Sequence, residues 1–94
     1  MSMFSTRKVK KNIDQLSDKE EDALYDRFVS MPLSRWHYKT ENDARSRHLG
    51  VVTEEALPEL VTEDGNSLSV VDYCGMLTLA VKVLNRRLAE KEAA

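Results

Sequence analysis

The sequence predicts a small α+β domain with short strands, a β-hairpin, one N-terminal helix and one long C-terminal helix. Three observations predict this class. Apolar residues recur at helical spacing near both ends of the chain, and they alternate with polar residues in its middle. Asp64-Gly65 lies between two apolar runs, which is typical of a hairpin turn. A chain of 94 residues buries only a modest core, so oligomerisation is a natural supplement to its stability.

The N-terminal part should contain an arm followed by a helix. Residues 5–13 lack a clean period, and we expect an extended arm or a short strand there. Ser17 and Glu20 form a capping box that starts a helix, because each side chain can satisfy a backbone donor of the other. Pro32 should end this helix, since proline disfavours helical backbone at the residue before it. The buried stripe is expected to consist of Leu24, Phe28 and Met31, with Tyr25 and Val29 beside it.

The middle of the chain should contain strands and turns. Residues 34–40 alternate in a way that predicts a half-buried strand, and residues 48–52 suit a second strand. Thr53 is expected to cap a helix of one or two turns, and residues 60–62 should pair with residues 68–71 as a hairpin. Gly50 and Gly65 should meet a close approach or a positive φ. The residues expected in the core are Trp36, Leu49, Val51, Leu57, Leu60 and Val71.

The last helix carries two apolar stripes. Asp72 is a suitable N-cap, and positive residues lie in the last turns, where they favour the helix dipole. The first stripe has the three-four spacing of a coiled-coil seam and consists of Cys74, Leu77, Val81, Leu84 and Leu88. The second stripe, which runs beside it, consists of Tyr73, Met76, Ala80 and Val83. Two stripes fit a helix that docks on its own domain and also meets copies of itself. They fit equally a helix buried deeply within one small domain.

Composition and charge limit the classes of function that the chain can have. Hydrophobic residues make up 41% of the chain and charged residues 32%, as in an ordinary soluble protein. No apolar run has the length of a membrane span, and the N-terminus has no secretory signal. A basic group in residues 7–11 could contact phosphate, but a pI of 5.7 argues against a nucleic-acid partner. The lone Cys74 excludes an internal disulfide, and we expect it to fill the core rather than act as a nucleophile.

Five segments in order resemble the endosialidase-type C-terminal intramolecular chaperone and auto-processing domains of phage tail spikes and fibres. Residues 5–13 resemble the family's opening, a serine followed by a basic run that ends in Lys-x-Asn-Ile. Trp36-His37-Tyr38 resembles its aromatic strand, and residues 47–61 are similar to its Gly-hydrophobic segment followed by Leu-Pro-Glu. Val71-Asp72-Tyr73 and the long final helix complete the series.

This resemblance implies a chaperone domain at residues 5–94 that forms a homotrimeric helical bundle, preceded by an upstream stub at residues 1–4. Such domains align an upstream fibre or tail-spike segment of the same polypeptide and then release themselves by autoproteolysis. The implied catalytic residues are Ser5 and Lys10, with cleavage between Ser5 and Thr6. The trimer axis would be lined by Leu77, Val81, Leu84 and Leu88. For a phage-type fibre, assembly would take place in the host cytoplasm. We expect no metal, cofactor, small-molecule ligand, membrane or nucleic acid.

The implied chemistry also has a physical basis. A serine hydroxyl becomes a good nucleophile when a base accepts its proton, and only a neutral lysine amine can do so. At an ordinary pKa of ~10.4, only ~0.04% of lysines are neutral at pH 7. Burial and neighbouring cations favour the neutral form, so assembly could switch the base on. The chain departs from the family in having Thr6 where aspartate is usual, and Thr53-Glu54-Glu55 where Ala-Gln-Glu is usual. Thr6 removes a carboxylate beside the cut bond, which bears on cleavage efficiency.

Other interpretations compete with this one. Ser5 and Lys10 taken alone would be an ordinary N-terminal tail. His37 and His48 could join Glu54 or Glu55 around a metal, but their spacing matches no common ligand pattern, and His48 should instead bond to the structure. The two glutamates could form an acid/base pair, although helix-dipole charges explain them better. The rival functions are a homo-oligomeric adaptor that never cleaves and a nucleic-acid-binding module.

Overall fold

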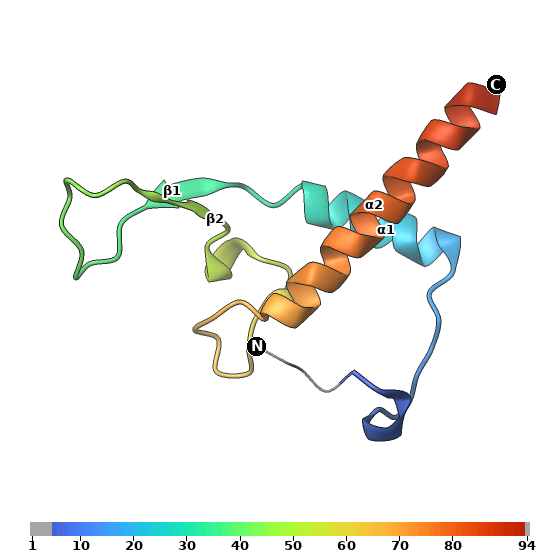
Figure 1. The fold of residues 1–94 in the computed structure, drawn as a ribbon, viewed down its shortest axis with the longest axis horizontal. Coiled ribbons are helices and arrows are strands. Elements are labelled where there is room, and N and C mark those ends of the chain that lie inside the picture. The colour runs from blue at the N-terminus through green and yellow to red at the C-terminus, as the bar shows by residue number, and fades with distance from the viewer. Residues whose placement is uncertain (1–4, 94) are drawn as a thin grey trace.

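A computed structural model of the chain describes residues 5–93, so the expected upstream stub at residues 1–4 lies outside the described part. Helix α1 (Asp18–Val29) crosses the long helix α2 (Val70–Ala93), and a two-stranded arm extends to one side (Figure 1). Three short 3-10 turns, η1 (Arg7–Val9), η2 (Thr53–Glu55) and η3 (Pro58–Leu60), complete the element order. The predicted small α+β domain, with an N-terminal helix, a long C-terminal helix and short strands, is confirmed. Its antiparallel pair is β1 (Ser34–Trp36) with β2 (His48–Gly50), and not the hairpin predicted between residues 60–62 and 68–71.

Helix α1 begins as the sequence predicts. The Ser17 hydroxyl accepts from the Glu20 amide at 3.2 Å, and the Glu20 carboxylate accepts from the Ser17 amide at 3.0 Å. The helix ends at Val29, shortly before Pro32. The half-buried side chains that pack against the core from this region are Leu24, Tyr25, Phe28 and Met31. Val29 instead points to solvent and is 56% exposed.

Strands β1 (Ser34–Trp36) and β2 (His48–Gly50) pair antiparallel and are shorter than predicted. A Cβ on Gly50 would lie 3.1 Å from Cη2 of Trp36, so the predicted close approach at this glycine is confirmed. Leu49 was expected in the core but is 67% exposed, because a two-stranded arm has one face without a packing partner. Trp36 is only half-buried for the same reason.

The segment between the arm and α2 is built from turns rather than strands. Thr53 does not cap η2, since the cap position is Val52 and the Thr53 hydroxyl donates to Glu54. The predicted hairpin is reduced to one bridge between Val61 and Leu68. Its turn has the expected positive φ, 77° at Gly65.

Helix α2 begins two residues before the predicted cap. The Ser69 hydroxyl accepts from the Asp72 amide at 3.4 Å, so Ser69 rather than Asp72 occupies the capping position. Val71 therefore lies in the first helical turn and is 51% exposed, contrary to the expectation that it belongs to the core.

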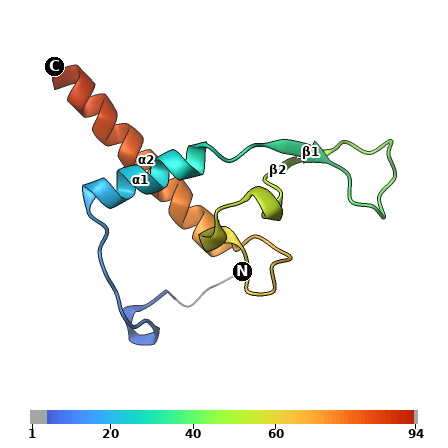
Figure 2. The ribbon, with the colours of Figure 1, turned by 180° about the vertical axis from the view of Figure 1, so that it is seen from behind.

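The core lies where α2 meets both α1 and the 3-10 turn η3; the crossing of the two helices is visible in Figure 2. Leu60 and Val83 are fully buried, and Val51 and Leu57 are buried as predicted. The core cluster consists of Leu57, Leu60, Met76, Leu79 and Val83. Three of these residues come from α2, so one face of the long helix organises the domain.

Candidate functional site

Ser5 and Lys10 contact each other. The Lys10 Nζ donates a hydrogen bond to the Ser5 Oγ at 3.2 Å, and both residues are exposed in the single chain. This is the relative position that a general base needs beside a serine nucleophile. The residues assigned to a dyad from the sequence are thus neighbours in space.

A single turn of backbone produces this contact. The Thr6 Oγ1 accepts from the Lys8 amide at 3.4 Å, which caps η1 at its start. The amides of Val9 and Lys10 then donate to the carbonyls of Thr6 and Arg7, each at 3.2 Å. The expected extended arm is therefore interrupted by a 3-10 turn. Because the turn folds the chain back, Lys10 reaches the residue that precedes the cap.

The seam of α2 is exposed. We use "seam" for the first apolar stripe, Cys74, Leu77, Val81, Leu84 and Leu88, and "inner stripe" for Tyr73, Met76, Ala80 and Val83. The seam leucines and Val81 are between 48% and 67% exposed, whereas Met76 is 8% and Val83 0% exposed. Cys74 was expected in the core but is exposed, because α2 turns the inner stripe toward the domain. The result is a long helix with an uncovered apolar face.

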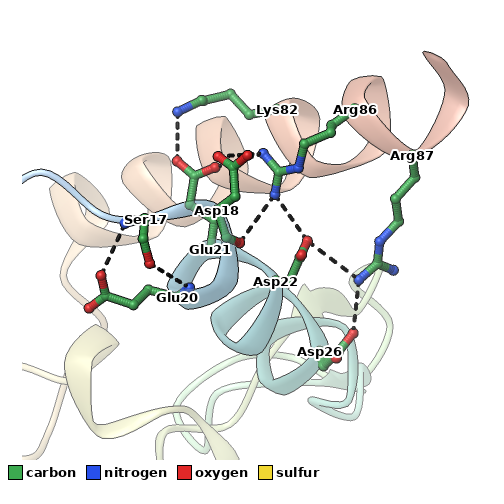
Figure 3. A network of polar contacts seen from close by, with 9 residues as sticks. All are labelled: Ser17, Asp18, Glu20, Glu21, Asp22, Asp26, Lys82, Arg86 and Arg87. Carbon is green, nitrogen blue, oxygen red and sulfur yellow. Dashed lines mark hydrogen bonds and ion pairs between the residues drawn. The ribbon is translucent and has the colours of Figure 1, made fainter. Parts of the chain in front are cut away.

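A network of charges joins α1 to α2 and was not predicted from the sequence (Figure 3). Glu21 is buried at 5% exposure and accepts from Lys82 at 2.6 Å and from Arg86 at 3.0 Å. Arg86 also reaches Asp22 at 3.0 Å, and Arg87 reaches Asp26 at 3.4 Å. We call this set, with Asp18, the clasp. The sequence does contain a pattern that indicates such a network: acids recur every four residues at 18, 22 and 26, and bases recur at 82 and 86.

The clasp shifts the ionisation of its members. Hydrogen bonds from Lys82 and then from Arg86 lower the pKa of Glu21 below its ordinary value, although burial acts in the opposite direction. The bonds to Glu21 and Asp22 raise the pKa of Arg86. Arg87 also stacks on Tyr25, with its guanidinium carbon 4.6 Å from the ring centroid. All these charges are satisfied by partners on the other helix, so they serve docking and not solvation alone.

The histidines lie on the arm and bond to neighbouring groups of the protein. His48 contacts both carboxylate oxygens of Glu41, at 2.9 and 3.0 Å, so it bonds to the structure as predicted. The Tyr38 amide, followed by His48, lowers the pKa of Glu41. His37 bonds to the carbonyl of Arg45 at 2.6 Å. Within residues 5–93, no group of three or more histidine, cysteine or acidic side chains is placed to hold a metal.

An apolar cavity of about 790 Å³ opens between the arm and the start of α2. Its wall includes Trp36, Leu49, Val52, Tyr73 and Cys74. Trp36 and Tyr38 meet edge to face with centroids 6.2 Å apart, and Tyr38 is 57% exposed. The two aromatic residues therefore form a half-open wall rather than the closed core expected of Trp36.

No protein-family model, no curated protein and no solved structure matches this chain. In the part of the chain that the structure describes, no helix is both long and apolar enough to cross a membrane.

Proposed function

We propose that this chain is an intramolecular chaperone domain that forms a homotrimer, aligns an upstream fibre or tail-spike segment of the same polypeptide, and is then released by cleavage between Ser5 and Thr6. The observation that carries the proposal is the hydrogen bond of 3.2 Å between Lys10 Nζ and Ser5 Oγ. The two residues that the family resemblance assigns to catalysis are thereby within proton-transfer distance of each other.

The exposed seam supports the assembly part of the proposal. Leu77, Val81, Leu84 and Leu88 have the spacing of coiled-coil core positions and are about half exposed or more. If this stripe packs against the same stripe of other copies, it would form the axis of a parallel helical bundle.

The cleavage chemistry follows from the dyad. The neutral Lys10 amine accepts the proton of the Ser5 hydroxyl, and the oxygen attacks the carbonyl carbon of a Ser5–Thr6 bond. The Thr6 nitrogen leaves with a proton from the lysine ammonium, and water then hydrolyses the ester. Both side chains are exposed in the single chain, and burial of an amine favours its neutral form. Their burial between copies would make the base available only after assembly.

The geometry of serine adds a second reason for assembly. The Oγ of Ser5 is joined to its own carbonyl carbon through Cβ and Cα only, so attack within one copy would close a strained β-lactone. A Ser5 oxygen supplied by a neighbouring copy has no such constraint. We therefore propose that each serine cleaves the bond of an adjacent chain in the trimer.

Mass spectrometry of the chain extended by its upstream segment tests the proposal. A fragment that begins at Thr6 should accumulate after assembly. Ser5→Ala should abolish the fragment by removing the nucleophile, and Lys10→Met should abolish it by removing the base while keeping the bulk. Lys11→Met is the matched control, since it removes a neighbouring charge only, and it should still be cut. Equal cleavage in Ser5→Ala would refute the dyad.

The second candidate is a homo-oligomeric adaptor that binds through α2 and does not cleave. The exposed seam favours it as strongly as it favours the chaperone, and Thr6 in place of the family's aspartate adds to its case. A stable trimer whose extended chain remains whole for days would select the adaptor.

A further inference from the structure

Helix α2 carries two stripes that could each serve as a coiled-coil seam. Every inner-stripe residue directly precedes a seam residue, as Met76 precedes Leu77 and Val83 precedes Leu84. Both stripes have the same three-four spacing, and they differ by a rotation of about 100° around the helix. Apolar spacing alone therefore does not determine which stripe faces a second copy of the chain.

The clasp supplies the missing distinction. Helix α1 covers the inner stripe together with Leu57 and Leu60 near η3, and its Phe28 packs edge to face on Tyr73 at a centroid distance of 5.5 Å. Contacts between charged groups hold it there, and the buried Glu21 receives two cations from α2. The next position of the inner stripe is Arg87, whose charge is held by Asp22 and Asp26 at 3.8 and 3.4 Å. On the seam, the corresponding position is Leu88.

We propose that the clasp selects the face through which α2 associates. By fixing α1 over the inner stripe, it leaves only the seam for a second copy of the chain. This inference rests on the proposed self-association. The occupant is another α2 because the seam is exposed and repeats at coiled-coil spacing over 15 residues (positions 74 to 88). Weakening the clasp frees the part of the inner stripe that α1 covers, and copies then pair through either face.

Cysteine cross-linking reads out which stripe is paired. Cys74 is the only cysteine and lies on the seam, so mild oxidation of the unaltered chain should link copies through it. A reporter chain with Cys74→Ser and Ala80→Cys carries its only thiol on the inner stripe. Its cross-linking between copies should remain at background. Adding Glu21→Gln and Asp22→Asn to the reporter should raise its cross-linking at least fivefold. Glu54→Gln with Glu55→Gln removes the same charge at exposed positions and should leave it at background.

The outcomes separate the two proposals. If Cys74 links copies but the folded reporter shows no cross-linking after the clasp is weakened, the proposal that the clasp selects the face is overturned and self-association stands. If Cys74 does not link copies and the chain scatters as a monomer, the proposed assembly fails, and this inference fails with it. Arg87→Gln is a milder second test for the case in which the double substitution unfolds the chain, as judged by circular dichroism. It removes the contacts of Arg87 to Asp22, Asp26 and the Tyr25 ring, and a silent reporter there also overturns the inference.

Discussion

The guanidinium of Arg86 lies 3.0 Å from the carboxylate of Glu21, which precedes it by 65 residues and is the one buried charged side chain in the described part of the chain. This contact joins the two helices across the domain. A buried carboxylate is costly unless it is paired, so its two cationic partners allow α1 to dock closely on α2.

Acid should loosen this docking. Lys82 and Arg86 lower the pKa of Glu21 in the folded state, so its ionisation stabilises the fold above the ordinary glutamate pKa of ~4.3. That contribution is lost as the pH falls through the lower folded-state value. We expect the melting temperature to be nearly constant between pH 7 and 5 and to fall below about pH 4. Thermal melts of Glu21→Gln should show a lower melting temperature at pH 7 and a weaker decline in acid. The same slope in both chains would contradict this role.

Replacing each of two glycines by alanine should change the free energy of unfolding in opposite directions. At Gly50 the new Cβ would lie 3.1 Å from the Trp36 ring, so Gly50→Ala should destabilise the fold by about 1–3 kcal/mol and alter tryptophan fluorescence. At Gly75, inside α2, nothing lies within 4 Å of the added methyl group. Gly75→Ala should therefore stabilise by about 0.5–1 kcal/mol through helix propensity. Urea unfolding measures both, and a loss of stability at Gly75 would indicate a contact there.

The sequence was informative where local chemistry decides the structure. The capping box at Ser17, the positive φ at Gly65 and the close approach at Gly50 each depend on neighbours or on one residue type, and all three were predicted. Burial was harder to predict, because Leu49 has the pattern of a core residue but lies on the uncovered face of a two-stranded arm. The clasp was missed because its charges are local on each helix and complementary only across the fold.

Leu84→Asp should dissociate the proposed trimer. Leu84 lies on the seam and is 53% exposed in the single chain, so the change should hardly affect the domain's own fold. In an assembled bundle it would place carboxylates together in a dry contact, where ionised groups are strongly disfavoured. Light scattering at about 20–50 μM should give three times the 10.7 kDa chain mass for the unaltered protein and the chain mass for the variant. Asn85→Asp, one residue further, is the control and should remain assembled. A dimer would refute the trimer while keeping the seam.

Residue 6 should tune cleavage through the turn that it caps. The Thr6 hydroxyl accepts from the Lys8 amide, and this turn brings Lys10 to Ser5. Aspartate is a better cap than threonine, so Thr6→Asp should raise the cleavage rate. Thr6→Val keeps the branched shape but removes the acceptor, and a lost cap of ~0.5–2 kcal/mol should slow cleavage about 2- to 30-fold. Timed mass spectrometry gives both rates, and equal rates would show that the cap does not position the dyad.

Cleavage between copies is testable with mixed trimers. A Ser5→Ala chain with a long upstream segment is co-expressed with an unaltered chain that carries a shorter one, so that each product has its own mass. If the serine of one copy attacks the bond of another, the Ser5→Ala chain should be cut before Thr6 in mixed trimers and should remain whole when expressed alone. Adding Leu84→Asp to that chain should protect it, because it can no longer join the trimer. If the unaltered chain is cut while its Ser5→Ala partner in the same trimer stays whole, each copy cleaves only itself, and the β-lactone argument against attack within one chain is wrong.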